Sequence, residues 1–175
     1  MISPHGNELI DRTINVSRSR ELRDCFNDYI AIKLDRNLLF DFMNIAHGVY
    51  SPLRGFMSRN DFLKTVHDLT LEDGVAWPLP IVLDVTNKLA KDVDPGDRVG
   101  ICHPDGTPIG ILDANSIYRY NETETCKNLF GTTDEDHPGV RAIQAKDPFL
   151  IGGSISAFSD MLSRSGNHDL TPKET

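Results

Sequence analysis

The sequence has few cysteines, no long apolar run and no excess of basic residues. The three cysteines Cys25, Cys102 and Cys126 are odd in number and widely spaced, which indicates neither a disulfide framework nor a zinc ligand pair. No apolar stretch approaches the ~20 residues that cross a bilayer, and the first residues lack a signal pattern. These absences disfavour secreted and membrane-spanning classes. They predict a cytoplasmic protein without a membrane partner.

Negative charge dominates the chain. The sequence has 18 Lys and Arg against 26 Asp and Glu, a net charge of −8, and residues 61–175 hold 10 of the basic and 19 of the acidic residues. Such a surface repels a phosphate backbone, and aromatic residues make up only 7% of the chain. We therefore expect no nucleic-acid partner.

The 175 residues, 39% of them hydrophobic, suit one globular domain with a buried core. Polar, turn-rich residues 1–16 predict an N-terminal arm, residues 17–153 the domain, and the polar residues 154–175 a linker-like tail.

Apolar spacing and turn residues predict short helices and strands. Helices are expected over 17–27 with a cap at Ser17 or Ser19, over 35–48, after a cap at Asn60, over 122–130 and over 137–145; strands are expected over 29–34, 80–85, 98–103, 108–114, 116–120 and 149–151. The Asp-Gly pair at 105–106 predicts a hairpin turn. This pattern favours an α+β, mainly β fold, with a small β-barrel and short flanking helices.

Common catalytic signatures are missing. The sequence contains no glycine-rich nucleotide motif, no nucleophile-elbow serine and no His-Glu-x-x-His, and no two of the six histidines lie three or four residues apart. We therefore assign no catalytic residue, no metal ligand and no cofactor-binding residue to this chain. A small complete enzyme that uses His103 or His137 is a remote alternative, because neither histidine has an assignable partner.

Three clusters each allow two interpretations. Asp134, Glu135 and Asp136 suit a hard cation but lack calcium-loop spacing, so a solvated loop is favoured. The arginines in 18–23 suit phosphate, but the acids among them favour a salt-bridged helix. His137 precedes a proline, which suits a projecting base or, by default, a capping residue.

A loop at 51–57 carries three large apolar residues, Leu53, Phe56 and Met57, beside Arg54 and Gly55. Loops rarely carry such residues unless something buries them. The loop either plugs the core of its own domain or contacts a partner. Neighbouring loop residues rarely all face one way, so we expect Phe56 inward and Leu53 or Arg54 outward.

Five motifs in order resemble the N-terminal domain of ATP sulfurylase (sulfate adenylyltransferase). The motifs are PHG at 4–6, YSPLRGFM at 50–57, LEDGVAWPLPIVLDV at 71–85, FGTTDEDHPGV at 130–140 and IGG at 151–153. The resemblance covers nearly the whole chain. It implies a PUA-like β-barrel and, for the full-length enzyme, conversion of ATP and sulfate into adenosine 5′-phosphosulfate and pyrophosphate with magnesium.

The resemblance also implies what this chain lacks. The family's catalytic segments, with a Gln-x-Arg-Asn-Pro motif and paired histidines, do not occur here, so the chain is expected to be inactive alone. The expected partner is an ATP sulfurylase catalytic domain, in cis or as a separate chain, with a homo-oligomer as a further possibility. Leu53, Arg54, Gly55, Phe56 and Met57 are the candidate domain-interface residues. Since PUA-like barrels also bind RNA, a stand-alone RNA-binding module is the alternative.

Overall fold

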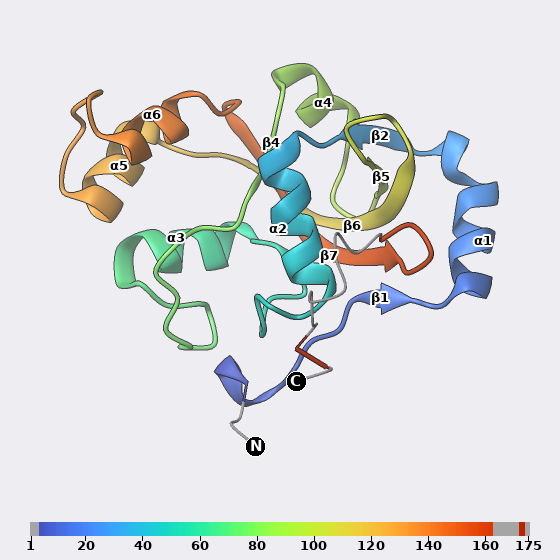
Figure 1. The fold of residues 1–175 in the computed structure, drawn as a ribbon. Helices are drawn as coiled ribbons and strands as arrows, with labels where there is room; N and C mark the ends of the chain where they lie inside the picture. Colours follow the sequence, from blue (N-terminus) through green and yellow to red (C-terminus); the bar gives the residue numbers. More distant parts are fainter. Residues whose placement is uncertain (1–3, 163–171, 174–175) are drawn as a thin grey trace. The chain divides into compact units, whose positions relative to one another are not determined.

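The computed structural model describes residues 4–162 and 172–173, and within them no helix is long and apolar enough to cross a membrane. The elements follow each other along the chain as shown in Figure 1. The described residues form two 3-10 helices, η1 (His5–Asn7) and η2 (Phe26–Asp28); α-helices α1 (Val16–Asp24), α2 (Arg36–Ala46), α3 (Arg59–Asp68), α4 (Asn87–Asp92), α5 (Glu122–Phe130) and α6 (Pro138–Gln144); and strands β1 (Thr13–Ile14), β2 (Ile30–Lys33), β3 (Gly55–Phe56), β4 (Leu83–Val85), β5 (Arg98–Cys102), β6 (Pro108–Arg119) and β7 (Phe149–Phe158).

The strands form one mixed sheet. Its order is β1-β7-β6-β5-β2, and β3 and β4 also pair with β7. Among the described strands this path has two free ends, so the expected closure into a barrel is not confirmed. More of the described residues lie in α-helices than in strands, so the fold is α+β but not mainly β. Turn residues in the sequence indicate where strands lie, but they do not indicate how many residues the strands contain in total.

The described chain divides into two compact units, and each is described by itself. The first unit comprises residues 1–55, 96–114 and 153–175, and the second comprises 56–95 and 115–152. The expected division into an arm, a domain and a tail stays a prediction. The part of the predicted tail at 163–171 and 174–175 lies outside the described residues.

The sheet of the first unit contains both parallel and antiparallel pairs. β2 runs parallel to β5, with Ile30 opposite Val99, and β5 runs antiparallel to the first part of β6, with Val99 opposite Leu112. β1 runs parallel to β7. A buried apolar cluster underlies this part of the sheet and comprises Leu22, Phe26, Cys102, Ile111 and Phe158.

The hairpin between β5 and β6 confirms the turn predicted from Asp-Gly. Gly106 has φ 96°, a conformation that glycine adopts without steric cost. The amide of Thr107 donates to the Asp105 carboxylate over 2.8 Å, and the amide of Gly106 donates to the carbonyl of His103 over 2.8 Å. The turn therefore fixes the register from local hydrogen bonds.

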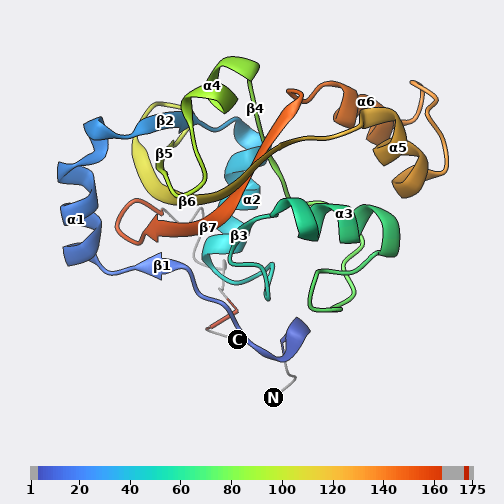
Figure 2. The same cartoon turned by 180° about the vertical axis from the view of Figure 1, so that it is seen from behind.

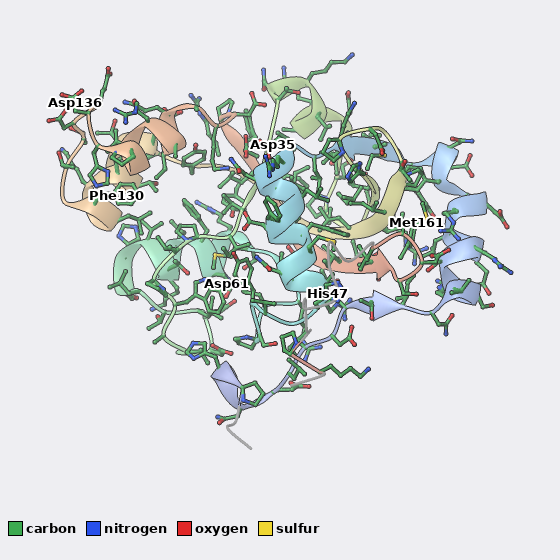
Figure 3. The ribbon with its side chains drawn as sticks, in the orientation of Figure 1. Asp35, His47, Asp61, Phe130, Asp136 and Met161 are labelled. Atoms are coloured by element: carbon green, nitrogen blue, oxygen red, sulfur yellow. The ribbon has the colours of Figure 1, made fainter. Side chains whose placement is uncertain are left out.

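Helix α2 also follows the sequence closely. The Asp35 carboxylate accepts from the amide of Leu38 over 2.8 Å, which caps the first turn as expected. Phe42 and Ile45 are fully buried on its inner face. Figure 3 labels Asp35 and His47 at the two ends of the helix. Gly48, with φ 80°, stops the helix at the predicted place.

The second unit combines four helices, α3 to α6, with paired strands. β4 runs antiparallel to β7, with Leu83 opposite Ile151. Helix α5 contacts both α3 and α6, and Figure 2 shows the same three helices from behind. The Tyr118 hydroxyl donates to the carbonyl of Met57 over 3.0 Å, and its ring lies 5.7 Å from that of Phe62.

Two helix caps differ from the prediction. Helix α1 is capped by Asn15, whose side chain accepts from the amide of Arg18 over 2.9 Å, rather than by Ser17 or Ser19. Helix α3 is capped by Ser58 rather than Asn60. Several good cap residues stand close together at both sites, so local preference alone could not choose among them.

Strand lengths and one helix were also misjudged. β6 is one continuous strand over Pro108–Arg119, where two were expected, and β7 continues to Phe158 instead of ending at Gly152. Helix α4 was not expected at all. Glycine and polar residues inside these strands suggested breaks, but pairing on both sides of β7 keeps it extended.

Candidate docking site

The loop after α2 is tied to the N-terminal segment. The buried Ser51 hydroxyl donates to the carbonyl of Gly48 over 2.6 Å and accepts from the amide of Ile10 over 2.9 Å. The following Ser51–Pro52 peptide bond is cis. Because both hydrogen bonds are buried, the start of the loop is held in one position.

Most of the candidate interface residues are buried within the chain. Leu53, Phe56 and Met57 are 6%, 2% and 1% exposed, and Gly55 is also buried. Among these five described residues, Arg54 alone is exposed. Phe56 thus lies inward and Arg54 outward, as the sequence indicated, while Leu53 lies inward. A contact made by this loop on a partner would therefore be made through Arg54.

The position of Arg54 is set by its backbone. Its carbonyl accepts from the amide of Ile155 over 3.0 Å, which places Arg54 beside β7. Its guanidinium lies 3.3 Å from the Glu8 carboxylate, and both side chains are more than half exposed. An exposed pair of this kind contributes little to stability, so Arg54 can exchange Glu8 for a carboxylate of another surface.

Gly55 is required by a close approach of two backbones. A Cβ at Gly55 would overlap the carbonyl oxygen of Gly153. The two residues are far apart in sequence, so the need for glycine at position 55 could not be read from the chain. The loop and β7 therefore form a rigid base for Arg54.

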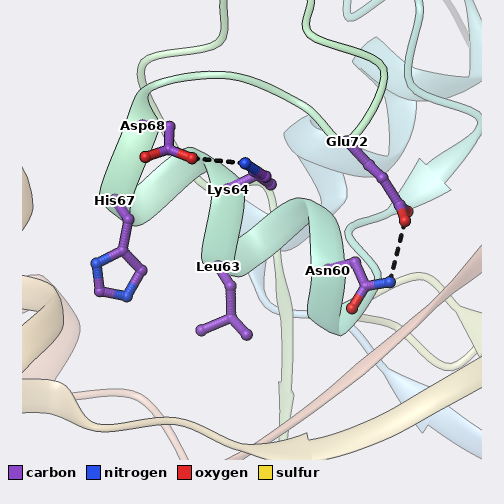
Figure 4. A pocket seen from close by; sticks show the side chains of 6 residues that line it. All are labelled: Asn60, Leu63, Lys64, His67, Asp68 and Glu72. Atoms are coloured by element: carbon purple, nitrogen blue, oxygen red, sulfur yellow. Dashed lines mark hydrogen bonds and ion pairs between the residues drawn. The ribbon is translucent and has the colours of Figure 1, made fainter.

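A hollow of about 290 Å³ lies on α3 in the second unit. Figure 4 shows its lining, which comprises Asn60, Leu63, Lys64, His67, Asp68 and Glu72. The ammonium group of Lys64 is neutralised by Asp68, which lies 2.7 Å away. The side chain of Asn60 donates a hydrogen bond to Glu72 over 3.1 Å. The hollow therefore has no free charge arranged for an anionic ligand.

The arginines in 18–23 and the carboxylates at 134–136 were the other two candidate clusters. Arg18 pairs with Glu21 over 2.6 Å and Arg23 with Asp160 over 2.7 Å, as a salt-bridged helix requires. Asp134, Glu135 and Asp136 are exposed, and the described residues contain no group of three or more His, Cys, Asp or Glu that could hold a metal ion. Within residues 4–162 and 172–173 no such cluster offers the ligands of a magnesium ion.

The two histidines considered as bases have local roles. The His137 ring accepts from the amide of Gly139 over 3.1 Å, which caps α6, and lies 4.9 Å from the Phe130 ring. His103 lies 3.0 Å from Asp105 within the hairpin turn. Capping and packing were the default expectation for His137, and the geometry agrees with it.

Sequence reasoning overlooked the outward side of α2. Phe40 is 55% exposed, and the Arg36 guanidinium lies 5.7 Å from the centre of its ring. The apolar spacing over 35–48 predicts one inward face that includes Leu39, but Leu39 is only half-buried. The available signal was the number of apolar residues in α2, which exceeds what one face can bury.

The sheet, its helices and the glycine-tied loop belong to a known class. The chain belongs to the family of PUA-like domains, whose model matches residues 2–160. A solved structure, titled as the hexameric APS kinase from Thiobacillus denitrificans, matches with a TM-score of 0.73 at 20% identity, over 99% of this chain and 30% of that chain. At this identity the likeness shows the fold alone.

Curated relatives confirm the resemblance drawn from the motifs. The sulfate adenylyltransferase of Hyperthermus butylicus is 38% identical over 172 residues, which are 98% of this chain and 44% of the relative. The sulfate adenylyltransferase of Ignicoccus hospitalis is 36% identical, over 98% of this chain and 45% of the relative. That of Halothermothrix orenii is 34% identical, over 100% of this chain and 46% of the relative. The chain therefore spans less than half the length of these relatives.

Proposed function

We propose that this chain is the non-catalytic N-terminal domain of an ATP sulfurylase. The observation that carries the proposal is the match to sulfate adenylyltransferases, which covers 98% of this chain but 44% of the Hyperthermus butylicus relative. The rest of such an enzyme would supply the groups that convert ATP and sulfate into adenosine 5′-phosphosulfate and pyrophosphate. ATP and magnesium would bind there, since the described residues of this chain offer no metal-binding cluster.

The role of the chain is then to pack on that catalytic domain. Arg54 is the proposed contact residue of the loop, because it is exposed and its pair with Glu8 is weak. Leu53, Gly55, Phe56 and Met57 hold the loop in place from the inside. The closure of this domain into a PUA-like barrel is a proposal, as are a catalytic domain in cis or as a separate chain and a homo-oligomer. No specific observation favours the RNA-binding alternative, which stays a prediction.

A chimera tests the proposal. This chain is joined to the part of the Hyperthermus butylicus enzyme that it does not match, and pyrophosphate release from ATP and sulfate is measured. We expect activity from the chimera and none from this chain or from the catalytic part alone. Turnover by the purified chain, or a folded chimera without activity, contradicts the proposal.

The role of Arg54 is tested in the same chimera. Arg54→Glu reverses the charge at the loop, whereas Arg119→Glu reverses the charge of another exposed arginine in the second unit. We expect Arg54→Glu to lower the melting temperature of the chimera but not that of the isolated chain. Equal effects of the two variants would contradict a contact through Arg54.

A further inference from the structure

Helix α2 has more apolar residues than its own unit buries. Leu38, Phe42 and Ile45 are buried on the inner side. Leu39 and Met43 are half-buried and Phe40 is 55% exposed. In a helix, positions 39, 40 and 43 lie on one continuous stripe, because residues three or four apart are neighbours. Asn37, Asp41 and Asn44 form a polar stripe on the remaining side, so the apolar surface of α2 is wider than its buried side and includes the stripe of Leu39, Phe40 and Met43.

The positively charged side chain of Arg36 lies at the N-terminal end of this stripe. Arg36 precedes Phe40 by one turn, and its guanidinium lies 5.7 Å from the centre of the Phe40 ring. The described residues place no carboxylate in an ion pair with Arg36, unlike Arg18, Arg23 and Arg98. The outer face of α2 therefore offers an apolar stripe with one cation. Its complement is an apolar surface that carries a carboxylate.

The course of the chain indicates what lies next to this face. The Lys173 ammonium lies 3.3 Å from the Asp11 carboxylate. The amide of the next residue, Arg12, donates over 2.9 Å to the carbonyl of Ala46, the last residue of α2. The last described residue, Lys173, thus contacts the segment that bonds to the C-terminal end of α2. More than half of each relative's length lies outside the match to this chain.

From these observations we infer that the outer face of α2, formed by Arg36, Leu39, Phe40 and Met43, is the docking surface for the catalytic domain. This inference rests on the proposed function. It assigns to the contact a helix face in addition to Arg54, and it requires a carboxylate of the catalytic domain opposite Arg36. Burial of the stripe would supply the apolar core of the contact, with the charges at its rim.

Cysteine labelling in the chimera tests whether the face is covered. Cys25 is exposed and is first changed to Ser, while Cys102 and Cys126 are buried. Phe40→Cys is then placed on the face, and Leu63→Cys is the matched control on α3, where Leu63 is 40% exposed. A maleimide reagent labels each variant in the isolated chain and in the chimera. We expect labelling at position 40 to slow at least about tenfold in the chimera, since a covered thiol reacts only through local opening, and labelling at position 63 to stay unchanged.

The outcomes separate this inference from the proposed function. An active chimera with unchanged labelling at position 40 overturns the docking face and leaves the function standing. An inactive chimera with unchanged labelling overturns both. Labelling that slows in the isolated chain as its concentration rises identifies a second copy as the occupant, which also overturns the inference.

Introduction of a charge gives a second, independent measurement. Phe40→Glu and Leu63→Glu each place a carboxylate on an exposed apolar position. We expect Phe40→Glu to lower the melting temperature of the chimera while the isolated chain melts as before, and Leu63→Glu to affect neither. Equal melting of the two chimeras overturns the docking face.

Discussion

The two compact units of the chain both combine buried apolar residues with hydrogen bonds between distant segments, but different contacts stand out in each. In the first unit, Leu22, Phe26 and Phe158 belong to one apolar cluster beneath paired strands. In the second, polar side chains bond across long sequence separations. The Tyr118 hydroxyl donates to Met57 over 3.0 Å, and the Lys146 ammonium lies 2.8 Å from the Asp84 carboxylate.

These contacts indicate which substitutions each unit tolerates least. Close packing makes the first unit intolerant of added volume, because the neighbouring backbone has no room to move. In the second unit, loss of a buried hydrogen bond such as that of Tyr118 leaves a polar group without a partner. The first unit also keeps an apolar helix face exposed, on α2, and this is the part for which we propose a partner.

The largest expected effect is that of Gly55→Ala in the first unit. The new Cβ would overlap the Gly153 carbonyl, so we expect a loss above about 4 kcal/mol in unfolding free energy, as severe overpacking produces. Gly139→Ala in the second unit is the control, because there the Cβ meets the end of the Phe130 ring, which can turn aside. Chemical denaturation measures both. Equal losses would contradict the difference between a backbone and a side-chain contact.

Phe56→Ala examines the loop whose residues were proposed for the interface. Phe56 is 2% exposed, so its truncation should cost about 3 kcal/mol or more, as in other cores. Phe40→Ala, at a ring that is 55% exposed, should cost far less in the isolated chain. Thermal melting and sedimentation distinguish the cases. Unchanged melting of Phe56→Ala with reduced self-association would show that Phe56 serves an interface instead.

Tyr118→Phe tests the polar interactions of the second unit. The change leaves the Met57 carbonyl without its buried donor and should cost about 1–2 kcal/mol. Burial raises the pKa of Tyr118, so its hydroxyl stays protonated and keeps donating. Tyr50→Phe in the first unit removes a hydroxyl that bonds to Asp41 over 3.3 Å and also to Asn44, and it should cost less because Tyr50 is less buried than Tyr118. A larger loss at Tyr50 would reverse the comparison between the units.

The smallest effect concerns two exposed carboxylates. Hydrogen bonds from Thr107, and then from His103, lower the pKa of Asp105 in the first unit from 3.8 to about 2. The hydrogen bond and charge of Lys64 lower the pKa of Asp68 in the second unit. Because the folded-state pKa of Asp105 is depressed, its contribution to stability is present above about pH 4 and is lost as the pH falls towards 2.

Salt separates these two carboxylates. The exposed ion pair of Asp68 is screened at high ionic strength, so its pKa should return towards the ordinary value. The pKa of Asp105 depends on backbone and hydroxyl donors and should move less. Carboxyl NMR titration at low salt and at about 1 M salt measures both shifts. A larger salt response at Asp105 would show that charge, rather than hydrogen bonding, sets its pKa.

The sequence by itself determined the features that depend on neighbouring residues. Asp35 and Gly48 mark the ends of α2 because a cap and a left-handed residue act within one turn. Asp105 and Gly106 mark the hairpin for the same reason. The motifs along the chain were enough to relate it to sulfate adenylyltransferases, and the curated relatives agree.

Only the tertiary structure decided the features that join distant residues. The approach of Gly55 to Gly153, the inward position of Leu53 and the open path of the sheet each depend on segments about a hundred residues apart. The same holds for the outer face of α2. Spacing showed that the helix was apolar, but the packing of the other elements determined which of its side chains stayed exposed, because each side is buried by a different part of the chain.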